Sequence, residues 1–68
     1  MHLTIETEAE TDGRWIAEVR DLPGVLAYGS TREEAIARAE ALALRVLADR
    51  LEHREAGPDL FSVTFRAA

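Results

Sequence analysis

The sequence predicts an α+β domain with the element order β-β-β-α-β. Three short segments alternate apolar with polar residues, as strands with one buried face do, and turn signals separate them. One long segment then repeats apolar residues at helical spacing, and a last alternating segment follows it. The pattern uses the whole length of 68 residues, so we expect a single domain over 1–68 without a C-terminal DNA-binding domain.

The first three strands are expected at residues 3–8, 14–20 and 25–29. In the second, Trp15 and Ile16 point to opposite faces and compete for the interior. Asp12-Gly13 predicts a type I′ hairpin turn, because glycine adopts positive φ without steric cost. Pro23-Gly24, within D-L-P-G, predicts a second turn. Two short connections imply an antiparallel meander.

The helix is expected from about residue 32 to 53, with Gly57-Pro58 closing the segment. Thr31 with Glu34, or Ser30 with Glu33, has the spacing of a capping box. The stripe expected to cover the sheet is Ala35, Ala39, Leu42 and Val46, widened by Ile36, Ala43 and Leu47.

The last strand, residues 60–66, is expected beside the first, because a strand reached over a long helix usually returns to an earlier one. Its apolar face is Phe61, Val63 and Phe65. The expected core comprises Leu3, Ile5, Trp15 or Ile16, Leu42, Val46, Phe61 and Phe65.

Composition limits the function classes. Thirteen acidic residues against eight basic ones give a formal net charge of −5, which disfavours nucleic-acid binding through phosphates and suits a basic protein partner. The absence of Cys is compatible with a reducing cytoplasm, where we expect the protein. No signal peptide or membrane-spanning stretch is evident.

A second apolar surface lies on the expected helix. A domain of this size buries only ~60% of its unfolded surface, so association is a common remedy. On the side of the helix away from the sheet we expect a candidate interface, whose residues are Ala37, Ala41, Leu44, Ala48 and Leu51. The predicted assembly is a homo-oligomer, either a dimer or a tetramer built from dimers.

No catalytic, cofactor or metal site is predicted. His2 and His53 stand at opposite ends of the chain without neighbours at ligand spacing. The acids at alternate positions from Glu6 to Asp12 suit a solvated strand face. A magnesium-dependent nuclease would need these acids to converge with Glu18 and Glu40, and we regard it as the weakest alternative.

One ordered set of residues carries a family resemblance. It comprises Gly13, Trp15, Asp21-Leu22-Pro23-Gly24, Gly29, Thr31 and Glu33-Glu34-Ala35. In this set the chain resembles the N-terminal domain of HicB-type antitoxins over about residues 3–50. The resemblance implies a partial RNase H-like fold, and a non-enzymatic role in masking a small basic toxin, similar to HicA, that cleaves mRNA. The alternative is an orphan HicB-like oligomeric domain with another protein partner.

Overall fold

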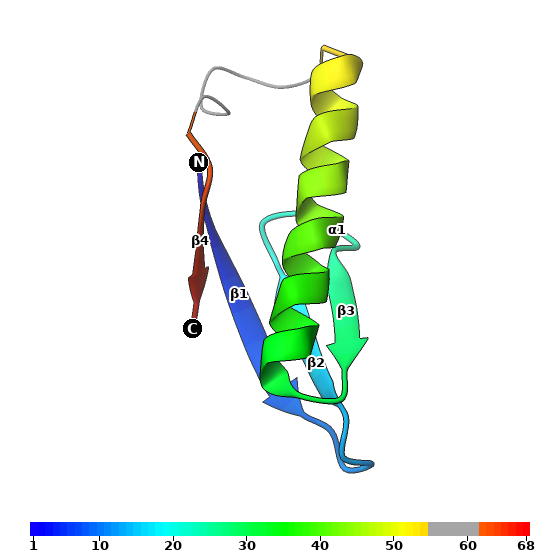
Figure 1. Ribbon diagram of the computed structural model, residues 1–68. Helices are drawn as coiled ribbons and strands as arrows, with labels where there is room; N and C mark the ends of the chain where they lie inside the picture. The colour runs from blue at the N-terminus through cyan, green and yellow to red at the C-terminus, as the bar shows by residue number, and fades with distance from the viewer. Residues whose placement is uncertain (55–61) are drawn as a thin grey trace.

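The chain forms a four-stranded sheet with one helix across one face, as the computed structural model shows (Figure 1). The structure describes residues 1–54 and 62–68. Its elements are β1 (His2–Ala9), β2 (Trp15–Val19), β3 (Leu26–Gly29), α1 (Arg32–Glu52) and β4 (Thr64–Ala67). The predicted α+β class and the order β-β-β-α-β are therefore confirmed.

The strand order in the sheet is β3-β2-β1-β4. β1, β2 and β3 pair antiparallel, as expected of a meander, and β4 lies parallel to β1. Two backbone bonds flank the β4 pairing: Thr64 N–H donates to Met1 O at 2.9 Å, and Ala68 N–H donates to Ile5 O at 2.9 Å. The last strand lies beside the first, as predicted. Residues 60 and 61 of the expected strand, with Phe61, lie outside the described residues.

The first turn differs from the prediction. Gly13 has a φ of +90°, but Asp12 does not share the positive φ that a type I′ turn requires at both central residues. Gly13 N–H donates to Glu10 O at 3.1 Å, and Glu10 N–H donates to Arg14 O at 2.7 Å, so three residues form the loop. Asp12 accepts from the Arg14 backbone N–H and guanidinium, which lower the pKa of its carboxyl group.

The second turn places two loop residues in the core. Val25 N–H donates to Leu22 O at 3.1 Å, and Gly24 has a φ of +82°, which is a type II turn with Pro23 at its second position. The side chains of Leu22 and Val25, at the two ends of this turn, are both only 2% exposed. The D-L-P-G segment thus closes one end of the core.

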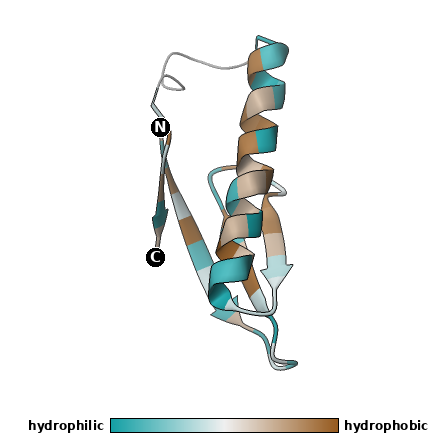
Figure 2. Cartoon of the chain, in the orientation of Figure 1, coloured by the Kyte–Doolittle hydropathy of each residue, from teal (hydrophilic) through white to brown (hydrophobic). Residues whose placement is uncertain are grey.

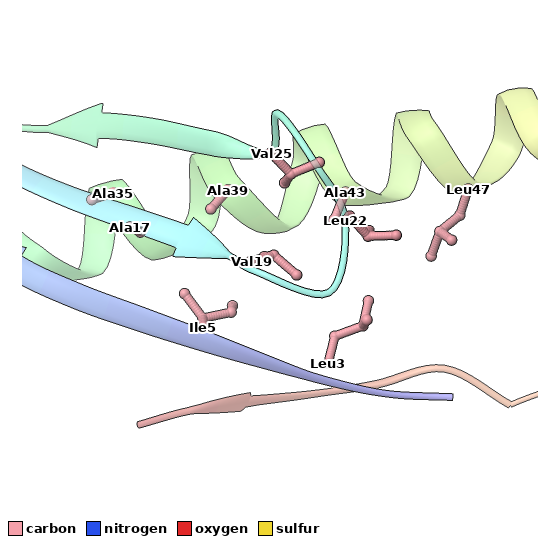
Figure 3. Close-up of a cluster of buried hydrophobic side chains, with 10 residues drawn as sticks. All are labelled: Leu3, Ile5, Ala17, Val19, Leu22, Val25, Ala35, Ala39, Ala43 and Leu47. Carbon is pink, nitrogen blue, oxygen red and sulfur yellow. The ribbon is translucent and has the colours of Figure 1, made fainter.

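The core lies between the inner face of the sheet and α1 (Figure 3). Trp15 packs at its margin, with Ala17 and Val19 buried, so Ile16 points to the other face. Leu3 and Ile5 are buried as predicted, while Leu42, Val46 and Phe65 are only partly buried. The fully buried residues of the cluster are Leu3, Ile5, Ala17, Val19, Leu22, Val25, Ala35, Ala39, Ala43 and Leu47.

The centre of the helix contact consists of small side chains. Ala35, Ala39, Ala43 and Leu47, spaced four residues apart, are the buried residues of α1. The expected stripe is therefore rotated: Ala43 and Leu47 lie at its centre, and Leu42 and Val46 at its edge. Small residues allow the helix to approach β3 closely. A Cβ built on Gly29 would lie 2.4 Å from the backbone nitrogen of Ala35.

Thr31 caps the start of α1. Its Oγ1 accepts from Glu34 N–H at 3.1 Å, while Glu34 Oε1 accepts from Ser30 N–H at 3.0 Å. The capping pair is therefore Thr31 with Glu34. At the other end, His53 is the C-cap residue and Arg54 has a φ of 56°. Gly57-Pro58, predicted to close this segment, lies outside the described residues. None of the helices described is both long and apolar enough to span a membrane.

Replacing Thr31 with alanine should lower the free energy of unfolding by about 1 kcal/mol, because one N–H of the first turn loses its acceptor. Urea denaturation followed by the fluorescence of the single tryptophan measures this change. Ser30→Ala is the matched control, since alanine keeps the backbone N–H that Glu34 accepts. Equal losses in the two variants would contradict the assigned cap.

Candidate functional site

No element of residues 1–54 and 62–68 covers the face of the sheet turned away from α1 (Figure 1). We call this surface the open face. Strand alternation places here the residues that do not enter the core, and the cross-strand register brings Glu6 opposite Glu18, Glu8 opposite Ile16, and Ile16 opposite Tyr28. A sheet covered on one side only presents a broad, rigid surface to a partner.

The part of the open face on β2 and β3 is apolar. Ile16 is partly buried and lies between Glu8 and Tyr28 on the neighbouring strands. Leu26 and Tyr28, both on β3, are 40% and 38% exposed. The guanidinium carbon of Arg14 lies 4.5 Å from the centroid of the Tyr28 ring, a cation–π contact. These apolar side chains form a patch next to the edge of the sheet.

Charged side chains flank this patch. Arg20 bridges two acids, with its NH2 group 3.2 Å from Glu6 Oε2 and its Nε 3.4 Å from Glu18 Oε1. These side chains are 44–70% exposed, so each pair contributes at most about 1 kcal/mol. Glu8 belongs to the same group but has no ion pair among the described residues. An open hollow is lined by Glu6, Thr7, Glu8, Ile16, Glu18 and Arg20.

The carboxylates expected of a nuclease do not converge. Glu6 and Glu18 are adjacent on the open face, whereas Glu40 belongs to α1 on the other side of the sheet. Arg20 occupies the position between Glu6 and Glu18 that a cation would need. Among residues 1–54 and 62–68, no three His, Asp or Glu side chains are grouped so that they could hold a metal ion.

The two histidines have separate hydrogen-bond partners. His2 Nδ1 lies 2.6 Å from Thr64 Oγ1, across the β1–β4 pair. His53 Nδ1 lies 2.8 Å from Asp49 O and 3.4 Å from its carboxylate, at the end of α1. Both interactions are at exposed positions and help to order the ends of elements.

The outer side of α1 is the second uncovered surface. We call its residues Ala37, Ala41, Leu44, Ala48 and Leu51 the outer strip. All five are exposed, with Leu44 at 51% and Leu51 at 56%. Apolar segments alternate with polar ones along the whole helix (Figure 2). The sequence-predicted interface residues therefore lie on one accessible side of the helix, away from the open face.

The apolar patch of the open face is absent from the sequence-based prediction. The sequence feature that could have predicted this patch is the alternation in the third strand. Because Val25 is buried, Ala27 and Gly29 face the core, and Leu26 and Tyr28 lie on the opposite face. A five-residue segment rich in apolar residues on both faces does not indicate which face is buried. The turn that buries Leu22 and Val25 determines which face of the third strand points to the core.

Comparison of the chain with protein-family models, curated proteins and solved structures finds no match. The functional argument therefore depends on the residues and surfaces of this chain.

Proposed function

We propose that this protein is an antitoxin that binds and masks a small, basic, mRNA-cleaving toxin similar to HicA. The observation that carries the proposal is the open face, which combines an uncovered apolar patch with carboxylates at its border. Support also comes from the ordered residues that resemble HicB-type antitoxins and from the net charge of −5. Because such a toxin cleaves mRNA, we propose that the protein acts in the cytoplasm.

The physical basis is complementarity between the two proteins. Leu26, Tyr28 and Ile16 offer apolar area that a partner can cover, while Glu8 offers an exposed charge for a basic side chain. Acidic groups beside an apolar patch steer a basic partner and disfavour acidic ones. The proposed role needs no catalytic group, because masking a toxin requires only that its RNA-binding surface is covered.

We further propose that the fold is partial RNase H-like. Support comes from the antiparallel meander followed by a helix and a fourth strand that joins β1 in parallel. The proposal concerns the architecture alone, since Glu6 and Glu18 are paired with Arg20, and Glu40 lies on the other side of the sheet from them.

The test uses the reading frame that neighbours the gene. Its product is expected to be short, basic and to contain histidine. Expressed alone it should arrest growth, and co-expression with this chain should relieve the arrest and give a complex that co-purifies. Absence of both binding and relief would overturn the antitoxin proposal. A chain that self-associates normally in that case would be the orphan oligomeric domain.

Glu8→Lys should weaken the complex by about tenfold or more, because it places a like charge against a basic partner. Glu8 has no ion pair among the described residues, so the fold should be unaffected. Glu52→Lys is the matched control: the substitution is identical and Glu52 is also exposed, but it lies at the far end of α1. Titration calorimetry with the neighbouring product measures both. Equal weakening would exclude the open face as the contact surface.

The chain alone should neither retard operator DNA in a gel shift nor cleave RNA with Mg²⁺ present. The described basic side chains do not form the concentrated stripe that duplex binding needs, and Arg14 and Arg20 are paired with acids. Magnesium-dependent cleavage that Glu6→Gln or Glu18→Gln abolishes would instead establish the nuclease alternative.

A further inference from the structure

β3 forms one edge of the sheet, and no other strand of residues 1–54 and 62–68 lies along its outer side (Figure 1). In an antiparallel pair, residues that exchange backbone hydrogen bonds alternate with residues whose N–H and C=O groups point away from the neighbouring strand. Val19 N–H donates to Val25 O at 2.9 Å, which fixes this alternation between β2 and β3. The backbone groups of Leu26 and Tyr28 therefore point outward, away from β2. An edge of this kind can pair with a strand of another chain.

Two side chains of α1 bind the backbone at the end of this edge. Arg38 Nη1 donates to Tyr28 O at 3.0 Å, and Glu34 Oε1 accepts from Ser30 N–H at 3.0 Å. Arg38 Nη2 also lies 3.3 Å from Glu34 Oε1, so an ion pair joins the two side chains. We call Glu34 and Arg38 the edge pair.

The edge pair makes the hydrogen bonds that a fifth strand would make. A residue of a strand added in parallel would donate its N–H to Tyr28 O, and its C=O would accept from Ser30 N–H. Arg38 supplies the same donor and Glu34 the same acceptor. A strand added antiparallel would also need Tyr28 O as an acceptor. In either direction, the new strand can pair here only after Arg38 has moved.

Helix capping explains only half of the edge pair. Glu34 accepts from Ser30 N–H as part of the capping pair with Thr31, and that arrangement needs no arginine. Arg38 belongs to the second turn of α1, where the backbone N–H groups already have partners within the helix. Its guanidinium reaches the strand instead. The contact of Arg38 with Tyr28 O is therefore a feature of the sheet edge and not of the helix end.

We propose that the edge pair is an autoinhibitory contact, which prevents β3 from pairing with β3 of a second copy. Every copy carries the same edge, so the strand that this contact excludes is always at hand when the protein is concentrated. A partner of the open face then covers the side chains of that face and does not extend the sheet beyond β3. The proposal does not depend on the antitoxin function, because it concerns the backbone edge of β3.

Arg38→Ala tests the proposal. The side chain of Arg38 is 61% exposed and alanine suits a helix interior, so the circular dichroism spectrum of the dilute variant should match that of the wild type. In sedimentation equilibrium, the mass of the variant should rise with concentration above that of the wild type. Amide hydrogen exchange followed by NMR locates the contact. Exchange of Leu26 and Tyr28 N–H should slow by about tenfold or more as the variant is concentrated, because these groups then bond to the added strand.

Arg45→Ala is the matched control. It is the same substitution at another exposed arginine of α1, and Arg45 makes no hydrogen bond or ion pair with a side chain of the described residues. This variant should keep the mass and the exchange rates of the wild type at every concentration. Wild-type behaviour of Arg38→Ala, or equal association of both variants, would overturn the proposal. Association of Arg38→Ala without slower exchange at Leu26 and Tyr28 would also overturn it, because the contact would then lie elsewhere.

Discussion

Replacing Gly29 with alanine should lower the free energy of unfolding by about 3 kcal/mol. The reason is the approach of two backbones rather than the conformation of the glycine. A Cβ at this position would lie 2.4 Å from Ala35 N and 2.9 Å from Glu34 C, both backbone atoms of α1. To avoid this clash, the first turn of the helix would have to move away from β3, and Ala35 would then be separated from the core.

Gly24→Ala is the control for the conformational role of glycine. Gly24 has a φ of +82° and a Cβ there would meet no atom within 4 Å, so alanine should cost about 1 kcal/mol of backbone strain. Urea denaturation of both variants at one protein concentration gives the comparison. Because a domain of this length has roughly 3–10 kcal/mol of stability, Gly29→Ala should remove about a third of that stability or more. Equal effects at the two glycines would contradict the close approach.

Replacing Leu22 with alanine should cost about 3 kcal/mol, because a leucine that is 2% exposed leaves a cavity when it is shortened. Leu22 belongs to a connection between strands, where truncation is ordinarily tolerated. Leu26→Ala is the matched control, since Leu26 is the same residue type, four positions away and 40% exposed. It should cost less than about 1 kcal/mol. Thermal unfolding followed by circular dichroism ranks the two, and a larger loss at Leu26 would refute the assigned core.

Local signals in the sequence predict most of the fold. Alternation in the first two strands, the Thr31 cap and the helical spacing each depend on neighbouring residues. The structure places the strands, the cap and the helix as expected, whereas the buried stripe of the helix is rotated toward Ala43 and Leu47. The prediction of a type I′ turn is wrong because a single glycine fits both a two-residue and a three-residue hairpin loop. The pairing of Glu10 with Arg14 selects the three-residue loop. Trp15 and Ile16 are both apolar and adjacent, so the sequence does not show which of them faces the core. That choice depends on which face of the sheet the helix covers.

The candidate surfaces differ in how far sequence predicts them. The outer strip can be predicted from helical spacing alone, because the position of a residue around the helix axis determines which side of the helix it lies on. The structure shows its five residues exposed. The open face needs two strands in register before Ile16 and Tyr28 become neighbours. The bridge from Arg20 to Glu6 and Glu18 also joins two strands. Such contacts depend on tertiary pairing, which composition and spacing do not determine.

The position of β4 has a consequence for the order in which the domain assembles. Each of the other strands pairs with its neighbour in sequence, whereas the contact of His2 with Thr64 joins residues 62 positions apart. Contacts across such long separations close late in folding, because the entropy of the intervening loop opposes them. Only Val63 and Phe65 of the described C-terminal residues reach the margin of the core. Local opening of β4 therefore leaves the meander and helix packed, while it frees one edge of β1 for a different strand.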